Sequence, residues 1–212
     1  MHQRLRPLLI LLALCINLDA WAQPFNTPDA STVISALFPG KSLFEWARSS
    51  GDFNEDGFGD LALIVTLSAD GTPMQTRLVV LAGSAAGTLT ALSVSSNYCE
   101  AQKFFNLSAK GSNLLVSAVQ TADANQMASE TLQFHFSRRL GDFELIGRED
   151  SWESYADNRS GRVSVNYLTG NTVEYAQVRG RTKEIRRQKF ATAPLARLNG
   201  FDCAQWLAGN PK

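Results

Sequence analysis

Short apolar runs are the first clear feature of this chain, and they indicate β-strands. The segments 61–67 and 78–81 are apolar almost throughout, as expected of strands that are covered on both faces. Polar or small-residue stretches follow them at Gly83–Gly87 and, later, at Thr121–Glu130. We expect these two stretches to be loops, and neither is long enough to be a linker between domains.

Two hairpins are predicted from strict alternation of apolar and polar residues. Every second residue along 131–136 is apolar, and a polar turn separates this segment from a further apolar strand at 143–146. The second hairpin joins 163–167 to 173–175 around Thr169-Gly170-Asn171. In both cases the turn residues lie between two strands of matching pattern, which is typical of antiparallel pairs.

Helical periodicity is confined to one short segment. Within Asp29–Phe38 apolar residues recur four positions apart, and Pro39-Gly40 would end a helix there. Because helical patterns are otherwise few and no domain boundary is evident, the sequence predicts one mainly β, antiparallel domain over residues 23–212.

Residues 1–22 have the organisation of a secretory signal peptide. A basic start and an apolar core precede small residues in Ala20-Trp21-Ala22, so we expect export and cleavage after Ala22. Cys15 would suit a lipoprotein signal, but Leu14 stands where a small residue is needed. No other segment is apolar for long enough to cross a bilayer, so no stable membrane anchor is expected.

Two cysteines remain after the signal, Cys99 and Cys203. In an oxidising compartment an isolated pair most often forms a disulfide, so we predict a bridge between them. It would tie the C-terminal segment to the body of the domain and restrict the unfolded chain by roughly 4 to 5 kcal/mol.

Composition excludes some partners. The chain has 20 Lys plus Arg against 20 Asp plus Glu, and charged residues make up 19% of it. This balance argues against long disorder and against a nucleic-acid partner. Two segments are nevertheless one-sided in charge, and they would either steer a charged partner or pair across a sheet. The basic residues are Arg179, Arg181, Lys183, Arg186, Arg187 and Lys189, and the acidic residues are Asp142, Glu144, Glu149, Asp150, Glu153 and Asp157.

The strongest local motif is the segment 51–60, in which oxygen-bearing side chains recur at alternate positions around Gly57. Calcium takes six to eight oxygen ligands at short range, so the chain must wrap tightly around it, and glycine permits the bend. We therefore expect a calcium site formed by four side chains and one backbone carbonyl: Asp52, Asn54, Asp56, Asp60 and, through its carbonyl oxygen, Phe58.

This loop differs from an EF-hand, because its twelfth position is Leu63 and an apolar strand follows directly. It resembles the calcium motif of integrin-like propeller repeats, in which the metal loop leads into a β-strand. A propeller would repeat the motif, whereas this chain has it once, so the metal would be structural. Without metal the same residues would form a tight Asx-rich turn.

Catalytic equipment is sparse, and we expect no enzymatic activity. After the signal the chain has one histidine, His135, on the polar side of an alternating strand, where a hydrogen-bonded surface histidine is typical. Neither a metal hydrolase site nor a serine triad has its residues in a recognisable motif. The acids between Glu149 and Asp157 would suit a glycosidase only if two of them faced each other across a sugar cleft.

The segment 152–161 is the candidate contact region for a partner protein. It carries aromatic and basic side chains of the kind that dominate protein interfaces, and we expect a loop anchored by rigid strands. The alternative is that Trp152 folds back as a lid on the core. The candidate contact residues are Trp152, Tyr155, Asn158, Arg159 and Ser160.

The signal, the calcium loop, and the segments 143–147 (Phe-Glu-Leu-Ile-Gly) and 164–170 (Ser-Val-Asn-Tyr-Leu-Thr-Gly) together resemble a group of exported bacterial proteins. That group includes immunity proteins that protect the periplasm from peptidoglycan-cleaving toxins delivered by type IV secretion, and it is similar in fold to periplasmic lysozyme inhibitors. The resemblance implies an eight-stranded β sandwich or barrel with one calcium. Lysozyme inhibitors often carry Ser-Gly closely followed by Tyr, whereas here Ser160-Gly161 precedes Tyr167 at a longer spacing.

What the resemblance implies for function is an inhibitor. Such a protein would sit in the periplasm and plug the cleft of a secreted, lysozyme-like peptidoglycan hydrolase, with Tyr155 as the projecting aromatic residue. The alternative is a calcium-dependent binding module for a cell-envelope glycan or a surface protein, which the integrin-like loop would suit.

Overall fold

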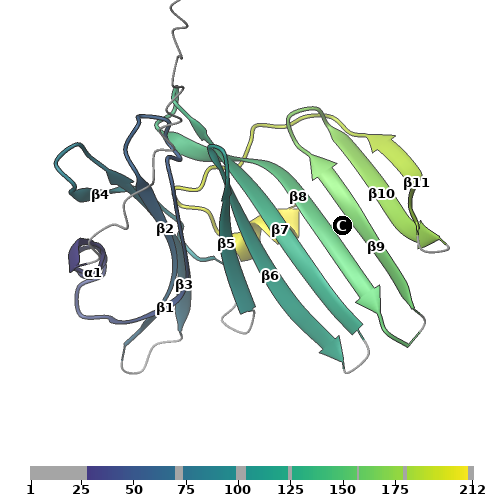
Figure 1. Ribbon diagram of the computed structural model, residues 1–212, viewed down its shortest axis with the longest axis horizontal. Helices are drawn as coiled ribbons and strands as arrows, with labels where there is room; N and C mark the ends of the chain where they lie inside the picture. The colour runs from purple at the N-terminus through teal and green to yellow at the C-terminus, as the bar shows by residue number, and fades with distance from the viewer. Residues whose placement is uncertain are drawn as a thin grey trace, which may run out of the picture.

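The computed structural model has eleven strands and two short helices within the part of the chain that it describes (Figure 1). That part comprises residues 28–69, 74–98, 104–123, 126–156, 158–178 and 181–209. The strands are β1 (Ser42–Gly51), β2 (Asp60–Ser68), β3 (Gln75–Gly83), β4 (Leu89–Val94), β5 (Phe104–Lys110), β6 (Asn113–Asp123), β7 (Gln126–Ser137), β8 (Asp142–Ser154), β9 (Arg159–Asn166), β10 (Asn171–Val178) and β11 (Arg181–Lys189), and the helices are α1 (Pro28–Leu37) and α2 (Cys203–Gly209).

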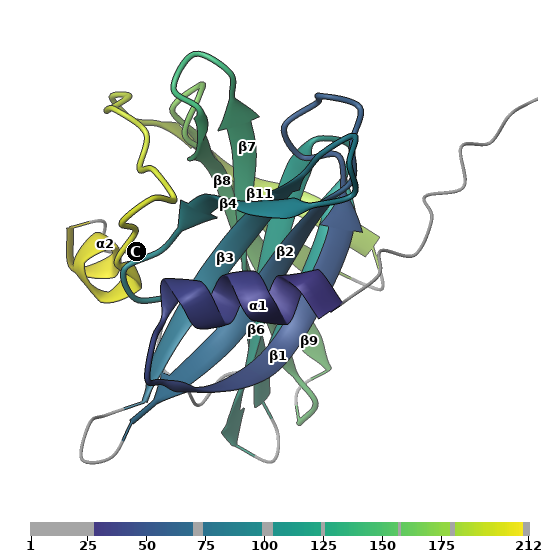
Figure 2. The ribbon, with the colours of Figure 1, turned by 90° about the vertical axis from the view of Figure 1, so that its left-hand side faces the viewer.

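The first four strands form an antiparallel sheet in the order β1-β2-β3-β4, and both of its faces are covered. Helix α1 lies across one face (Figure 2), where Ile34 packs against residues such as Leu63 and Val79. The residues next to these in the strands, such as Ile64 and Val80, point to the other face and into the main core. The two apolar runs are therefore strands covered on both sides, as predicted, because the pleat sends successive side chains to opposite faces.

The remaining seven strands form a second antiparallel sheet in the order β11-β10-β9-β8-β7-β6-β5. Both predicted hairpins are present, as β7–β8 and β9–β10. The expectation of a loop over Thr121–Glu130 was wrong, because β6 continues to Asp123 and β7 begins at Gln126. Backbone pairing with β8 holds this polar segment as a strand, without an apolar stripe to mark it.

The main core fills the space between the two sheets. It combines Ile64 and Leu78 of the first sheet with Phe134 and Phe143 of the second, and Phe201 of the C-terminal segment closes one side. Buried polar contacts join the sheets as well: the Ser93 hydroxyl on β4 donates to Asp142 Oδ1 on β8 over 2.7 Å.

The fold is thus mainly β and antiparallel, as the pattern predicts. Of the expected sandwich or barrel, the structure has two separate sheets and no closed barrel among the described residues. The described residues contain eleven strands, whereas the resemblance implied eight. Helix α1 matches the predicted helix at 29–38 to within a residue, whereas α2 was not expected.

Among the described residues, no helix has the length and apolar character that a membrane crossing requires. The predicted signal peptide, with Cys15 and Ala22, lies outside the described residues.

Candidate functional site

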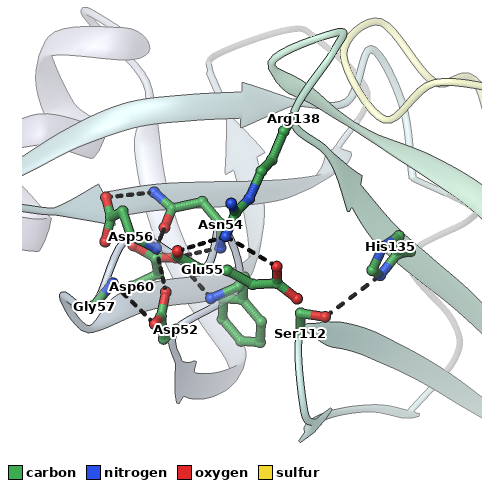
Figure 3. A network of polar contacts seen from close by, with 10 residues as sticks. Asp52, Asn54, Glu55, Asp56, Gly57, Asp60, Ser112, His135 and Arg138 are labelled. Atoms are coloured by element: carbon green, nitrogen blue, oxygen red, sulfur yellow. Dashed lines mark hydrogen bonds and ion pairs between the residues drawn. The ribbon is translucent and has the colours of Figure 1, made fainter.

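The acidic segment connects β1 to β2 and folds into a tight loop held by its own side chains (Figure 3). The Asp52 carboxylate accepts hydrogen bonds from the backbone N–H groups of Asp56 and Gly57, both over 3.0 Å. The Asn54 side-chain oxygen also accepts from Asp56 N–H, and Asp56 Oδ1 accepts from Phe58 N–H over 2.8 Å. Three of the four predicted side-chain ligands therefore turn toward the same loop backbone.

Two residues of this loop have the left-handed backbone conformation. Gly57 has φ of 88°, which fits the sharp bend predicted from its position, and a Cβ there would meet nothing within 4 Å. Glu55 has φ of 58°, which is uncommon for a residue other than glycine. A contact from outside the loop accompanies this strained residue.

That contact is made by Arg138, in the turn between β7 and β8. Its Nη2 lies 2.9 Å from the Glu55 carbonyl oxygen and 3.1 Å from Glu55 Oε2. A hydrogen bond from Ser112 and the charge of Arg138 lower the pKa of Glu55. The acidic loop is thus fastened to the second sheet, a link that the sequence did not suggest because the two residues are 83 positions apart.

The fourth predicted ligand, Asp60, has a different environment. Its side chain is fully buried, and its carboxylate accepts three backbone hydrogen bonds, from Phe53 and Asn54 to Oδ2 and from Gly83 to Oδ1. Burial raises the pKa of Asp60, and the backbone hydrogen bonds oppose that shift. Asp60 therefore joins the acidic loop to the end of β3, and a single lone pair, on Oδ1, remains for any further partner.

The loop offers the oxygen donors that calcium prefers, but several of these oxygens already accept hydrogen bonds from the loop itself. Asp52 and Asp56 each retain acceptor capacity, because a carboxylate offers about four lone-pair sites. Among the described residues no group of three or more His, Cys, Asp or Glu side chains is arranged to hold a metal. The third donor near these two acids is the Asn54 amide, which also donates to Asp56 Oδ2 over 2.8 Å.

The predicted aromatic contact region lies at the end of β8 that is opposite to the β7–β8 turn and Arg138. Strand β8 continues to Ser154 and β9 begins at Arg159, so Trp152 and Ser160 lie on strands and not in the expected long loop. Tyr155 is 57% exposed and Trp152 is 46% exposed. The alternative in which Trp152 closes the core is therefore wrong.

This end of the hairpin is held by cross-strand contacts. Trp152 is paired with Gly161, and a Cβ at Gly161 would lie 2.8 Å from atoms of the indole ring. Asn158 has φ of 50°, which makes the tight turn between the strands, and Arg159 is exposed beside it. Ser160 donates to Gln177 on β10 over 2.8 Å, so it is partly committed to the sheet.

The two one-sided charge segments are separated in the fold. The acidic residues lie on or at the start of β8 and the basic residues on β11, with β9 and β10 between them, so they do not pair across neighbouring strands. The exceptions are Asp157 and Arg179, which are outside the described residues. On β11 Arg187 pairs with Glu184 of the same strand over 2.7 Å.

A buried cation that the sequence did not single out is Arg148 on β8. Its side chain is 4% exposed, and Nη2 lies 2.9 Å from both Glu130 and Asp150. The guanidinium lies 5.5 Å from the centre of the Trp206 ring, on α2. This cluster attaches the C-terminal segment to the sheet.

The two remaining predictions concern a histidine and a disulfide. His135 is hydrogen-bonded, with Nδ1 2.9 Å from Asn113 Oδ1, as expected for a polar strand face. Cys203 is fully buried and disulfide-bonded. Cys99 lies outside the described residues, although its neighbour Asn97 accepts a backbone hydrogen bond from Cys203 over 3.0 Å. The pairing with Cys99 stays a prediction.

Comparison with protein-family models, with curated proteins and with solved structures finds no match to this chain.

Proposed function

We propose that this protein is an exported inhibitor that binds a secreted, lysozyme-like peptidoglycan hydrolase and occludes its active site, as the expected resemblance to periplasmic immunity proteins implies. The observation that carries the proposal is the exposure of Trp152 and Tyr155 at the end of the β8–β9 hairpin. Large aromatic side chains at a protruding tip lose little entropy on binding and fill pockets well, which makes them frequent centres of protein interfaces.

Two strand residues beside this turn are held in place. Trp152 packs on Gly161, and the Ser160 hydroxyl donates to Gln177, so these two side chains are already ordered before binding. A pre-ordered contact region avoids part of the entropic cost of association. Arg159 beside the tip would meet the carboxylates that a peptidoglycan hydrolase uses for acid–base chemistry.

The experiment is a peptidoglycan-cleavage assay with hydrolases from the type IV secretion repertoire, titrated with the purified protein. The wild type is expected to suppress cleavage by a cognate enzyme, and Tyr155→Ala to weaken suppression by about 10- to 100-fold. Leu168→Ala, which removes a side chain of similar exposure from the opposite end of β9, is the matched control and should leave suppression unchanged. Failure to bind any hydrolase of this class would refute the proposal.

We further propose that the acidic loop binds calcium through Asp52, Asn54, Asp56, the Phe58 carbonyl oxygen and the remaining lone pair of Asp60. The support is the inward turn of the first three side chains and the bend at Gly57. Bound calcium would neutralise neighbouring carboxylates and strengthen the link between β1 and β2. At a free concentration 100-fold above its dissociation constant it would stabilise the fold by about 2.7 kcal/mol.

Calorimetric titration tests this site directly. Asp56→Ala should abolish calcium binding, whereas Glu45→Gln, which changes an acid on β1 outside the loop, should not. Heat from calcium that is unchanged in Asp56→Ala would show that the loop is an Asx-rich turn without metal. Export, cleavage after Ala22 and the Cys99–Cys203 bridge are proposed with the same function, and mass spectrometry of the non-reduced protein from a periplasmic fraction checks all three.

A further inference from the structure

The outer face of the seven-stranded sheet, on the side away from the core, is unusually rich in short hydroxyl side chains. Thr131 and Gln133 lie on this face because they alternate with the core residues Leu132 and Phe134. Residues directly opposite each other in neighbouring strands share a face. Ser129, Ser151, Arg162 and Tyr175 therefore form one row across β7, β8, β9 and β10.

A second row lies two residues further along each strand, on the same face. It contains Thr131, Glu149 and Ser164, which are cross-strand partners on β7, β8 and β9. Thr131 also shares a hydrogen bond of 2.8 Å with Ser117 on β6, as Ser129 does with Ser151 over 2.7 Å. The side chains of both rows are thus held in place by their neighbours.

The short side chains leave the face hollowed. One hollow of about 340 Å³ is lined by the first row, and a second of about 370 Å³ is lined by the second row. Since the rows are adjacent, the hollows lie next to each other along the strands. Each is within the size range of small-molecule sites.

Fixed charge in the hollows is balanced. Arg162 lies 3.5 Å from Glu149, and Lys110 and Glu153 are the other charged side chains that line the two hollows on this face. An anionic or cationic ligand would therefore find no excess of opposite charge. Serine, threonine and glutamine can each donate and accept a hydrogen bond, which suits a ligand with many hydroxyl groups.

An aromatic wall completes the first hollow. The Arg162 guanidinium lies 4.5 Å from the centre of the Tyr175 ring, and Arg162 and Tyr175 are also cross-strand partners. This contact holds the ring in a defined place in the row. An aromatic ring beside hydroxyl groups can cover the apolar C–H surface of a sugar while neighbouring side chains bond its hydroxyls.

From these features we infer that the outer face binds a neutral oligosaccharide along the two hollows. On β6, β7 and β8 the face carries serine and threonine side chains that pair with each other, and the long side chains Arg162 and Glu149 are held by their mutual ion pair, so part of the face stays uncovered. Two adjoining hollows suit a linear chain of sugar units better than a single one. The inference does not rest on the proposed inhibition of a hydrolase.

An NMR titration of the full mature chain with N-acetylglucosamine tetramer and with cellotetraose tests the inference. Shifts should concentrate at Ser129, Ser151, Arg162 and Tyr175. Tyr175→Ala should lower the affinity by about tenfold and Ser151→Ala, which removes only a hydroxyl, by about threefold. Phe44→Ala, which removes an exposed aromatic side chain from the other sheet, is the matched control and should leave the affinity unchanged.

Four outcomes would overturn the inference. The first is the absence of shifts at about 10 mM of either sugar, and the second is shifts that lie elsewhere on the molecule. The third is a strong loss of sugar affinity when salt is added. The fourth is protection of this face by a bound hydrolase when no sugar binds. Strong salt dependence would identify an ionic ligand. Protection by a hydrolase would identify the face as a protein interface. Trp152 and Ser160 of the proposed inhibitory contact region also line the first hollow. Retained suppression of a hydrolase by Tyr175→Ala, together with lost sugar binding, would separate sugar binding from the proposed inhibition.

Discussion

The Trp152 indole ring lies against Gly161, its cross-strand partner, so closely that a Cβ on residue 161 would be 2.8 to 2.9 Å from three ring atoms. Real Cβ atoms do not approach an aromatic ring to that distance. The absence of a side chain at Gly161 therefore lets the Trp152 ring pack against the backbone at the end of the β8–β9 hairpin. The orientation of this exposed ring depends on a residue with no side chain of its own.

Gly161→Ala should therefore displace the Trp152 ring. We expect the free energy of unfolding to fall by about 1 to 3 kcal/mol, because the new methyl group overpacks the contact. Urea denaturation measures the change, and the Trp152→Ala background supplies the control, since Gly161→Ala should cost much less once the ring is absent. An equal cost in both backgrounds would show that the ring does not set the requirement for glycine.

Asp60→Asn should destabilise the protein whether or not calcium is present. The change replaces one carboxylate oxygen by a donor that faces buried backbone N–H groups, and we expect a loss of about 2 to 4 kcal/mol. Asp56→Ala should instead lose most of its effect when calcium is removed, because the hydrogen bonds that its carboxylate accepts from Phe58 N–H and the Asn54 amide lie in the exposed part of the loop. Urea denaturation in calcium and in a chelator separates the two roles. An effect of Asp60→Asn that disappears in chelator would make Asp60 chiefly a metal ligand.

The sequence predicted the parts of the fold in which apolar residues mark a face. The hairpin formed by β7 and β8 and the doubly covered strands β2 and β3 were visible because their side chains alternate or run without interruption. Strand β11 has no such mark. All of its side chains are exposed, and backbone pairing to β10 holds it, so periodicity could not reveal it.

In the candidate sites, too, the sequence predicted only what a local pattern of residues contains. Regular spacing placed Asp52, Asn54 and Asp56 in one loop, and the structure brings their oxygens together. The inward orientation of Asp60 depends on Gly83, which is 23 positions away, and no local pattern contains that information. The outer-face rows likewise arise from register across four strands.

Arg148→Met should be strongly destabilising, because it leaves Glu130 and Asp150 without their buried cation. Removing one member of such a cluster typically costs about 3 to 5 kcal/mol. The control is Arg187→Met, which breaks the exposed pair with Glu184 and should cost less than about 1 kcal/mol. Chemical denaturation of both variants gives the comparison. Equal effects would mean that water reaches the Arg148 cluster.

Tyr167 should make the protein less stable at high pH. Burial is the main cause that raises its pKa from 10.0 to about 12. Between these values the unfolded chain loses the phenol proton while the folded protein keeps it, so the free energy of unfolding falls as pH rises. With allowance for partial exposure, the loss is about 2 kcal/mol from pH 10 to 12.

Tyr167→Phe isolates this contribution, because it removes only the phenol hydroxyl of Tyr167. At pH 8 the variant should be less stable than the wild type by about 1 kcal/mol, because the hydrogen bond between the phenol and Arg148 is lost. As pH rises toward 12 the wild type alone loses the Tyr167 contribution, so the difference between the two proteins should shrink and then change sign. Urea denaturation at pH 8, 10 and 11.5 follows this difference. A constant difference would mean that the Tyr167 phenol ionises as readily in the folded protein as in the unfolded chain.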